Sequence, residues 1–183
     1  MKDKQMIMTI LIGLVLSIGF LIYSNLTSAE NISEADQVAI YTAVIHQQYT
    51  VDDTFGGSLN APVTYIINTT NDAIGDPAGD KADPVTLSDS VQHQITANLS
   101  DLPTQIVWVN SSSQVPIDTQ TGIVEEDGVI ITLGNIHPKV DGSVHVPASI
   151  YIANLAAGGQ TYVLHTSGES WIVKGTTGVQ WIS

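Results

Sequence analysis

The first long hydrophobic stretch of the chain runs from Met6 to Tyr23 and contains no charged side chain. As a helix, its 18 residues would extend about 27 Å, which is close to the thickness of the hydrocarbon core of a bilayer. Lys2 and Lys4 precede this stretch, and positive residues favour the cytoplasmic side of a membrane. The pattern predicts a single-pass membrane anchor within residues 1–29, with all later residues outside the cytoplasm.

Two other interpretations of this segment remain open. Thr27, Ser28 and Ala29 offer small residues for cleavage before Glu30, and cleavage there would make the protein secreted. The apolar run is longer than the core of a typical signal peptide, and Thr is less usual than Ala at the first of those positions, so we favour a retained anchor. A pilin-like assembly helix is the third interpretation, although the acidic residue of the type IV pilin pattern is missing.

Two amphipathic helices are predicted after this segment. Residues 33–49 begin with Ser33 as a plausible N-cap and repeat apolar residues at spacings of three and four. Residues 86–89 resemble a capping box with Asp in place of Glu, and apolar residues follow at intervals of four. The apolar positions of the two helices are Val38, Tyr41, Ile45 and Tyr49, and then Leu87, Val91, Ile95 and Leu99.

The remaining residues are rich in β-branched and aromatic side chains, which predicts strands. A first strand is expected at residues 62–69, before a long polar loop at 71–84. The later strand segments are residues 105–110, 129–133, 144–154, 160–165, 170–174 and 179–182. Several of the connections between them are short enough for hairpins, so we expect consecutive strands to pair antiparallel. The prediction is a single α+β domain over residues 30–183, with two helices packed on a curved antiparallel sheet.

Two stretches carry resemblances to known families. Residues 160–175, a polar-Tyr-Val-Leu run followed by a Ser-Gly turn and Trp-Ile-Val, are similar to the last hairpin of many NTF2-like and cystatin-like domains. That resemblance implies a cone-shaped fold and no particular activity. Residues 49–56, 131–138 and 155–183 resemble short sequence motifs shared by an uncharacterised family of exported bacterial proteins. This second resemblance implies membership of a family without assigned chemistry.

The charge of the chain limits its partners. There are 18 Asp and Glu against 5 basic residues, all of them lysine, and the formal net charge is −13. Three lysines and 17 carboxylates lie beyond Tyr23, so the exported part carries a formal charge of −14. Such a surface repels phosphate, and without arginine it has no guanidinium fork for bases or phosphate, which argues against nucleic acid. Cations or a basic protein surface are the partners it favours.

Two groups of residues are candidates for metal binding. The loop at 71–84 carries Asp72, Asp76, Asp80 and Asp83, whose oxygens could bind Ca²⁺ outside the cell, although the EF-hand spacing is absent. The alternative is a solvated acidic loop. His137 and His145 flank a predicted turn, and a hairpin could bring them together as ligands of a transition metal. The alternative for the histidines is an ordinary role as polar residues at strand ends.

Recognised catalytic patterns are missing from the sequence. There is no cysteine, which excludes disulfides, thiolate metal sites and cysteine nucleophiles, and no nucleotide-binding or nucleophile-elbow motif is present. We therefore favour a membrane-anchored, non-enzymatic extracytoplasmic protein that acts as an interaction or accessory subunit of a membrane or envelope assembly. One alternative is a ligand-binding or enzymatic NTF2-like pocket, with His93, Asp53 or His165 as candidate polar groups. Another is a calcium-dependent surface or adhesion domain.

Overall fold

The structure is a computed structural model that describes residues 32–52, 59–168 and 170–183. The predicted anchor at residues 6–23, the cleavage motif at 27–29 and Asp53 lie outside the described residues. Within the described ranges, no helix has both the length and the hydropathy needed to cross a membrane.

The first described helix, α2 (Glu34–Thr50), begins where the sequence predicts it. Ser33 is its N-cap, and its hydroxyl accepts a hydrogen bond from the backbone N–H of Asp36 at 3.1 Å. Acidic residues occupy the first turn, where the helix dipole stabilises negative charge. The predicted apolar stripe is buried, which fixes the face that α2 turns toward the sheet.

The second helix, α3 (Asp89–Asn98), is capped by Ser88, two residues later than the predicted start of the capping box. The Ser88 hydroxyl accepts a hydrogen bond from the N–H of Val91 at 3.3 Å. Thr86 instead forms an isolated bridge with Thr69, which holds the chain before the helix in an extended conformation. Val91 and Ile95 are buried, as their spacing predicts.

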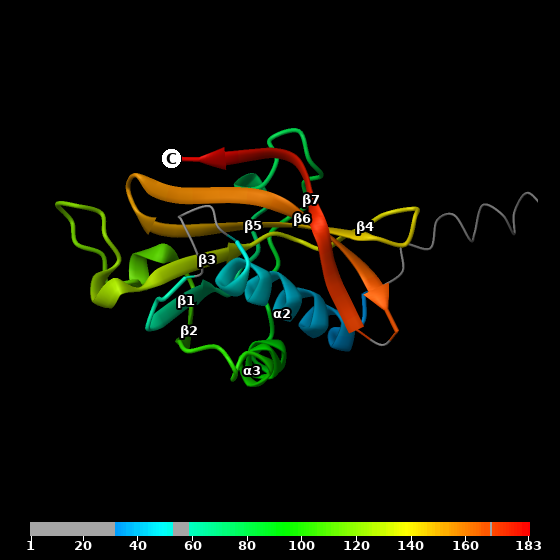
Figure 1. Ribbon diagram of the computed structural model, residues 1–183, viewed down its shortest axis with the longest axis horizontal. Helices are drawn as coiled ribbons and strands as arrows, with labels where there is room; N and C mark the ends of the chain where they lie inside the picture. Colours follow the sequence, from blue (N-terminus) through cyan, green and yellow to red (C-terminus); the bar gives the residue numbers. More distant parts are fainter. Residues whose placement is uncertain (1–31, 53–58, 169) are drawn as a thin grey trace, which may run out of the picture. The chain divides into compact units, whose positions relative to one another are not determined.

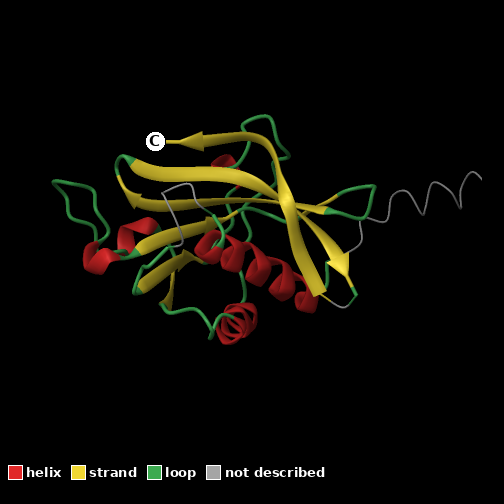
Figure 2. Ribbon diagram, in the orientation of Figure 1, coloured by secondary structure: helices red, strands yellow, loops and turns green. Residues whose placement is uncertain are grey.

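Seven strands form one open, mixed sheet in the order β2-β1-β3-β5-β6-β7, and β4 also pairs with β5 (Figure 1). The strands are β1 (Val63–Ile67), β2 (Gln105–Val109), β3 (Val129–Leu133), β4 (His137–Pro138), β5 (Val144–Ala153), β6 (Ala156–Ser167) and β7 (Ser170–Ile182). Both helices lie on one side of this sheet (Figure 2). The α+β class and the two helices packed on a sheet are therefore confirmed.

The prediction of a wholly antiparallel sheet is wrong at one end. Strand β1 pairs parallel with β2 on one side and with β3 on the other. The chain between β1 and β2 includes α3, and a long irregular segment at 110–128 joins β2 to β3. Connections of this length allow a parallel crossover, whereas β5, β6 and β7 pair as the expected antiparallel hairpins. The two strands predicted at 170–174 and 179–182 are instead one continuous strand, β7, without the predicted turn between them.

The sheet is covered on both faces. On the helix side, the core includes several side chains with no exposed surface, among them Ile40, Val44, Ile66, Ile131, Val146 and Leu164. On the other side, the 110–128 segment contributes Val115 and Val124 to a second apolar cluster with Tyr65, Val109 and Ile130. The loop around the short helix η1 (Asp72–Ile74) also packs there, close to Pro147 and Thr161. The residue next to Pro147, Ala148, faces α2 instead, as strand alternation requires.

Candidate functional site

The four aspartates of the predicted calcium loop have separate partners. Asp76 accepts a hydrogen bond from the N–H of Ala78 at 3.0 Å, Asp80 forms an ion pair with Lys139, and Asp83 is exposed. Asp72 is buried, with only 4% of its surface exposed. Nowhere in the described ranges do three or more His, Asp or Glu side chains form a group that could hold a metal ion. Calcium binding by this loop stays a prediction.

Asp72 fastens the loop to the sheet through its carboxylate. Oδ1 accepts a hydrogen bond from the backbone N–H of Asn135 at 2.6 Å. Oδ2 accepts one from the Asn135 side-chain amide at 2.9 Å and one from the N–H of Ala82 at 2.8 Å. Burial raises the pKa of Asp72, but the hydrogen bonds from Asn135 and Ala82 outweigh it and hold this pKa below its usual value. Asp72 therefore remains ionised and joins two segments of the chain.

The predicted meeting of the two histidines does occur. His137 on β4 lies directly opposite His145 on β5 in an antiparallel register, so both side chains leave the same face of the sheet. The Nε2 atom of His137 is 3.1 Å from Oδ2 of Asp72, and both side chains are largely buried. This buried Nε2 has no hydrogen-bond partner within the described part of the chain. The two side chains are therefore in close polar contact without a hydrogen bond between them.

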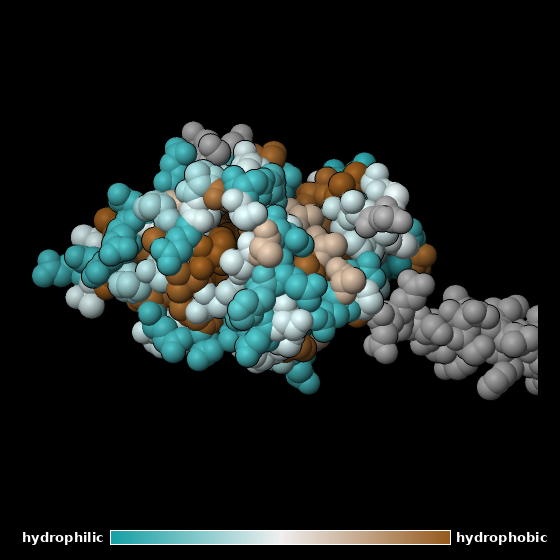
Figure 3. All heavy atoms as spheres, turned by 90° about the horizontal axis from the view of Figure 1, so that it is seen from below, coloured by the Kyte–Doolittle hydropathy of each residue, from teal (hydrophilic) through white to brown (hydrophobic). Residues whose placement is uncertain are grey.

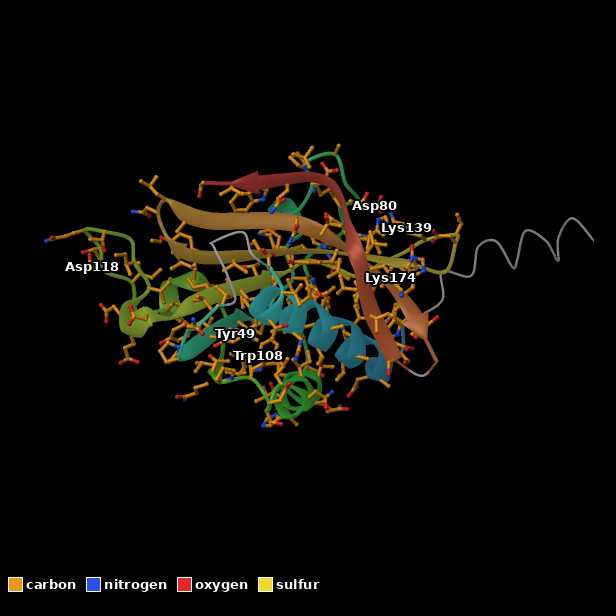
Figure 4. All side chains as sticks on the ribbon, in the orientation of Figure 1. Tyr49, Asp80, Trp108, Asp118, Lys139 and Lys174 are labelled. Carbon is orange, nitrogen blue, oxygen red and sulfur yellow. The ribbon has the colours of Figure 1, made fainter. Side chains whose placement is uncertain are left out.

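A polar cleft of about 240 Å³ opens beside this pair on the face away from the helices. It is lined by residues of the acidic loop and of strands β4, β5, β6 and β7, among them Asp80, His137, Lys139, His145, Thr161 and Thr177. Figure 4 shows Asp80 and Lys139 side by side. The hydrogen bond from Lys139 holds the pKa of Asp80 below its usual value, while burial and then the charge of Lys139 lower the pKa of His145.

A second and larger cleft lies between the helices and β7, and we call it the α2–β7 groove. Its main part has a volume of about 540 Å³ and is lined by residues of α2, the end of α3 and the first half of β7: Ala39, Thr42, Ala43, His46, Gln47, Asn98, Ser170, Trp171, Ile172 and Val173. Seen from the helix side, the surface has hydrophobic patches between hydrophilic side chains (Figure 3). The lining of the groove contains both apolar and polar side chains.

Gln47 and Val173 also line a polar extension of the groove, of about 200 Å³. There the Asp52 carboxylate accepts hydrogen bonds from the Gln160 amide at 2.7 Å and from the Tyr162 hydroxyl at 2.9 Å. Burial, followed by the charge of Asp52, raises the pKa of Tyr162 well above its ordinary value. Tyr162 therefore stays protonated and acts only as a hydrogen-bond partner.

Trp171 lines the groove and is hydrogen-bonded to the first turn of α2. Its indole N–H donates to Oδ1 of Asp36 at 2.9 Å, and hydrogen bonds from Ser33 and then Trp171 lower the pKa of Asp36. The other two tryptophans donate within the fold as well, Trp108 to Thr96 and Trp181 to the carbonyl of Ile74. Of the three, only Trp171 lines the groove, and its hydrogen bond joins β7 to the first turn of α2.

The remaining sequence candidates are not brought into either cleft. His93 is exposed on α3 and contacts the carbonyl of Asp89 at 2.8 Å, and His165 is half-buried on β6. Sequence reasoning missed the α2–β7 groove. The available signal was weak: Ala39, Thr42 and Ala43 form a strip of small side chains beside the buried stripe of α2.

Comparisons of the chain with protein-family models, with curated proteins and with solved structures found no match.

Proposed function

We propose that this protein is a non-enzymatic, extracytoplasmic interaction domain, anchored through residues 6–23, that binds an extended segment of another membrane or envelope protein in the α2–β7 groove. The observation that carries the proposal is the position of the groove along a strand at the edge of the sheet. A partner segment placed there has both a side-chain groove and a backbone edge to bind.

Strand β7 offers backbone hydrogen-bonding groups to the partner segment. It pairs with β6 on one side only, and no other described strand follows it in the sheet. An edge strand presents N–H and C=O groups that an added strand can satisfy. In such β-augmentation, main-chain hydrogen bonds supply affinity and side-chain pockets supply specificity.

The groove offers side chains that can contact those of the partner segment. Ala39, Ala43, Ile172 and Val173 give it apolar surface whose burial would favour binding. Thr42, also in the lining, has a buried hydroxyl oxygen without a hydrogen-bond partner in the described ranges.

Charge indicates the nature of the partner. Asp36 holds Trp171 at the rim, and Asp101 lies 3.2 Å from His46, another groove residue. Together with the formal charge of −14 beyond Tyr23, these carboxylates would repel a second copy of the chain and attract a basic segment. We therefore expect the bound segment to carry Lys or Arg residues beside its apolar ones.

A small polar ligand is the second candidate, and the network of Asp52, Gln160 and Tyr162 favours it. An NTF2-like cone would place such a ligand between the helices and the sheet. The space lined by Gln48, Ala148 and Ile150 has a volume of only about 10 Å³, room for a single water. The ligand would therefore occupy the open polar extension of the groove.

Replacing Ala43 with Glu should strongly weaken the binding of the partner segment in the groove. Ala43 is half-buried in the groove, so the new carboxylate would lie among its apolar side chains. The carboxylate would lose its water when the partner segment covers the groove, which disfavours binding. We expect the amount of partner that co-purifies with the full-length protein from detergent-solubilised native membranes to fall at least about tenfold, equivalent to about 1.4 kcal/mol.

Ala97→Glu is the matched control, because Ala97 is exposed on α3 and does not line the groove. This variant should retain the partner, and both variants should keep the thermal midpoint of the wild type within a few degrees. Undiminished co-purification with Ala43→Glu, or equal loss with Ala97→Glu, would place the binding surface elsewhere and refute the proposal.

A further inference from the structure

Acceptor sequences for N-linked glycosylation, called sequons, are frequent in this chain. A sequon is Asn-x-Ser or Asn-x-Thr, where x is any residue except proline. Because Ser and Thr make up about a fifth of the chain, chance would place about two of its nine asparagines in a sequon. Five stand in one: Asn25, Asn31, Asn68, Asn98 and Asn110. The last three lie within the described residues, so the structure can distinguish between them.

The sequon at Asn68 is used by the fold itself. The side-chain amide of Asn68 donates a hydrogen bond to Oδ1 of Asn110 at 2.9 Å. Thr70, which supplies the hydroxyl of this sequon, has only 2% of its surface exposed. Its hydroxyl donates to Oδ1 of Asn135 at 2.8 Å and accepts from the N–H of Val85 at 2.7 Å. Both groups that define the acceptor are therefore engaged, and the folded protein does not offer Asn68 to a glycosylating enzyme.

The sequon at Asn98 is anchored by its middle residue. Asn98 is the last residue of α3, and Leu99 beside it has only 1% of its surface exposed. An enzyme could hold this tripeptide only after Leu99 had left the core, which costs the free energy of its burial. Asn98 also lines the α2–β7 groove, so a glycan there would fill the space proposed for the partner segment.

Asn110 presents its sequon in a surface loop directly after β2. Asn110, Ser111 and Ser112 are all exposed, and Ser111 has an extended backbone with φ −160° and ψ 161°. Oδ1 of Asn110 accepts the hydrogen bond from Asn68, which holds the side chain in place. Neither the amide nitrogen of Asn110 nor the hydroxyl of Ser112 has a hydrogen-bond partner among the described residues. This tripeptide can enter an enzyme without the unfolding of a strand or an α-helix.

We propose that Asn110 carries an N-linked glycan, an inference that rests on the extracytoplasmic location in the proposed function. The donor is an oligosaccharide joined to a membrane lipid through a diphosphate, and a membrane-bound transferase brings it to the exported chain. The amide nitrogen of Asn110 forms a bond to the anomeric carbon of the first sugar and loses a proton. The bond between that carbon and the diphosphate oxygen breaks, and the lipid diphosphate leaves with its electron pair.

The glycan would protect one edge of the sheet. Among the described strands, β2 pairs with β1 alone, so β2 is an edge strand as β7 is. Exposed edges favour unwanted strand pairing, and proteins commonly cover them. A bulky, hydrophilic glycan attached directly after Val109, the last residue of β2, would hinder an added strand there. The edge at β7 would remain open to the partner segment.

Peptide mass spectrometry of the full-length protein, purified from its native membranes, tests the proposal. Cleavage after aspartate separates the three sequons, because Asp72 and Asp101 lie between them. We expect one or more sugar residues on Asn110 in most molecules. Ser112→Ala should abolish the modification although Asn110 itself is unchanged. Ser113→Ala is the matched control, because Ser113 is an exposed serine outside the sequon, and this variant should keep the glycan.

An unmodified Asn110 in the wild type would overturn the proposal, and so would a modification that persists in Ser112→Ala. Labelling of intact cells with a membrane-impermeant amine reagent separates this failure from a failure of the proposed function, because Lys174 is exposed. Labelled Lys174 with unmodified Asn110 would refute the glycan and leave the extracytoplasmic location standing. Unlabelled Lys174 with unmodified Asn110 would refute both.

Discussion

Replacing Asp72 with alanine should lower the free energy of unfolding by about 3 kcal/mol at pH 7. The carboxylate accepts three hydrogen bonds from Asn135 and Ala82 and lies beside a largely buried His137. Alanine would leave buried donors without an acceptor, each at a cost of about 1–3 kcal/mol, of which relaxation and water entry recover part. Chemical denaturation at pH 7 measures the loss.

The same residue makes stability depend on pH. Because the pKa of Asp72 is lower in the folded protein than in the unfolded chain, its stabilisation is complete above about pH 4, the ordinary Asp pKa. It is lost as the pH falls through the lower, folded value. The wild type should therefore lose more stability below pH 4 than the Asp72→Ala variant does.

Asp83→Ala is the control from the same loop, because that side chain is exposed. It should change the free energy of unfolding by no more than about 0.5 kcal/mol. Equal effects of the two substitutions would show that the buried contacts of Asp72 do not hold the loop against the sheet.

Gly159→Ala should cost about 3 kcal/mol, because the added methyl group has no room. A Cβ atom at Gly159 would lie 2.2 Å from the carbonyl oxygen of Ile74 and 2.5 Å from Nε1 of Trp181. Those two groups form the 2.7 Å hydrogen bond that fastens the end of β7 to the η1 loop. Overpacking of this kind usually costs about 1–3 kcal/mol, and here a hydrogen bond is lost in addition.

Gly142→Ala separates steric clash from backbone strain. Gly142 has a φ of +80°, but a Cβ atom there meets nothing within 4 Å. Its replacement should cost about 1–2 kcal/mol, the usual penalty for a left-handed conformation. Guanidinium unfolding measures both losses. A larger loss of free energy of unfolding for Gly142→Ala than for Gly159→Ala would contradict the close packing of η1 against β6 and β7.

Local patterns predicted the elements that depend on neighbouring residues. The buried stripe of α2 follows from spacings of three and four, and Ser33 caps the helix because a short polar side chain can reach the free N–H of Asp36. The pairing of His137 with His145 follows from the predicted turn that they flank, although no strand was predicted at residues 137–138, where β4 lies. Each of these inferences needed fewer than twenty residues of sequence.

Features that join distant parts of the chain could not be predicted in this way. Asp72 resembles a solvated loop carboxylate, but its main partner, Asn135, is 63 residues away. The parallel pairing of β1 with β2 and β3 depends on how two long connections cross the sheet. The α2–β7 groove combines Ala43 with Val173, and neither segment alone indicates a cleft.

Site-specific photo-crosslinking in the native membrane is the most direct test of the proposed function. A photo-reactive residue in place of Val173 would lie on β7 in the lining of the groove, whereas the same residue in place of the exposed Ala97 is not part of that lining. We expect Val173 to give one discrete crosslinked partner whose attached peptide is basic and extended, and Ala97 to give none. A crosslink at Ala97 without one at Val173, or crosslinks only between copies of this chain, would contradict the groove as the site of partner binding.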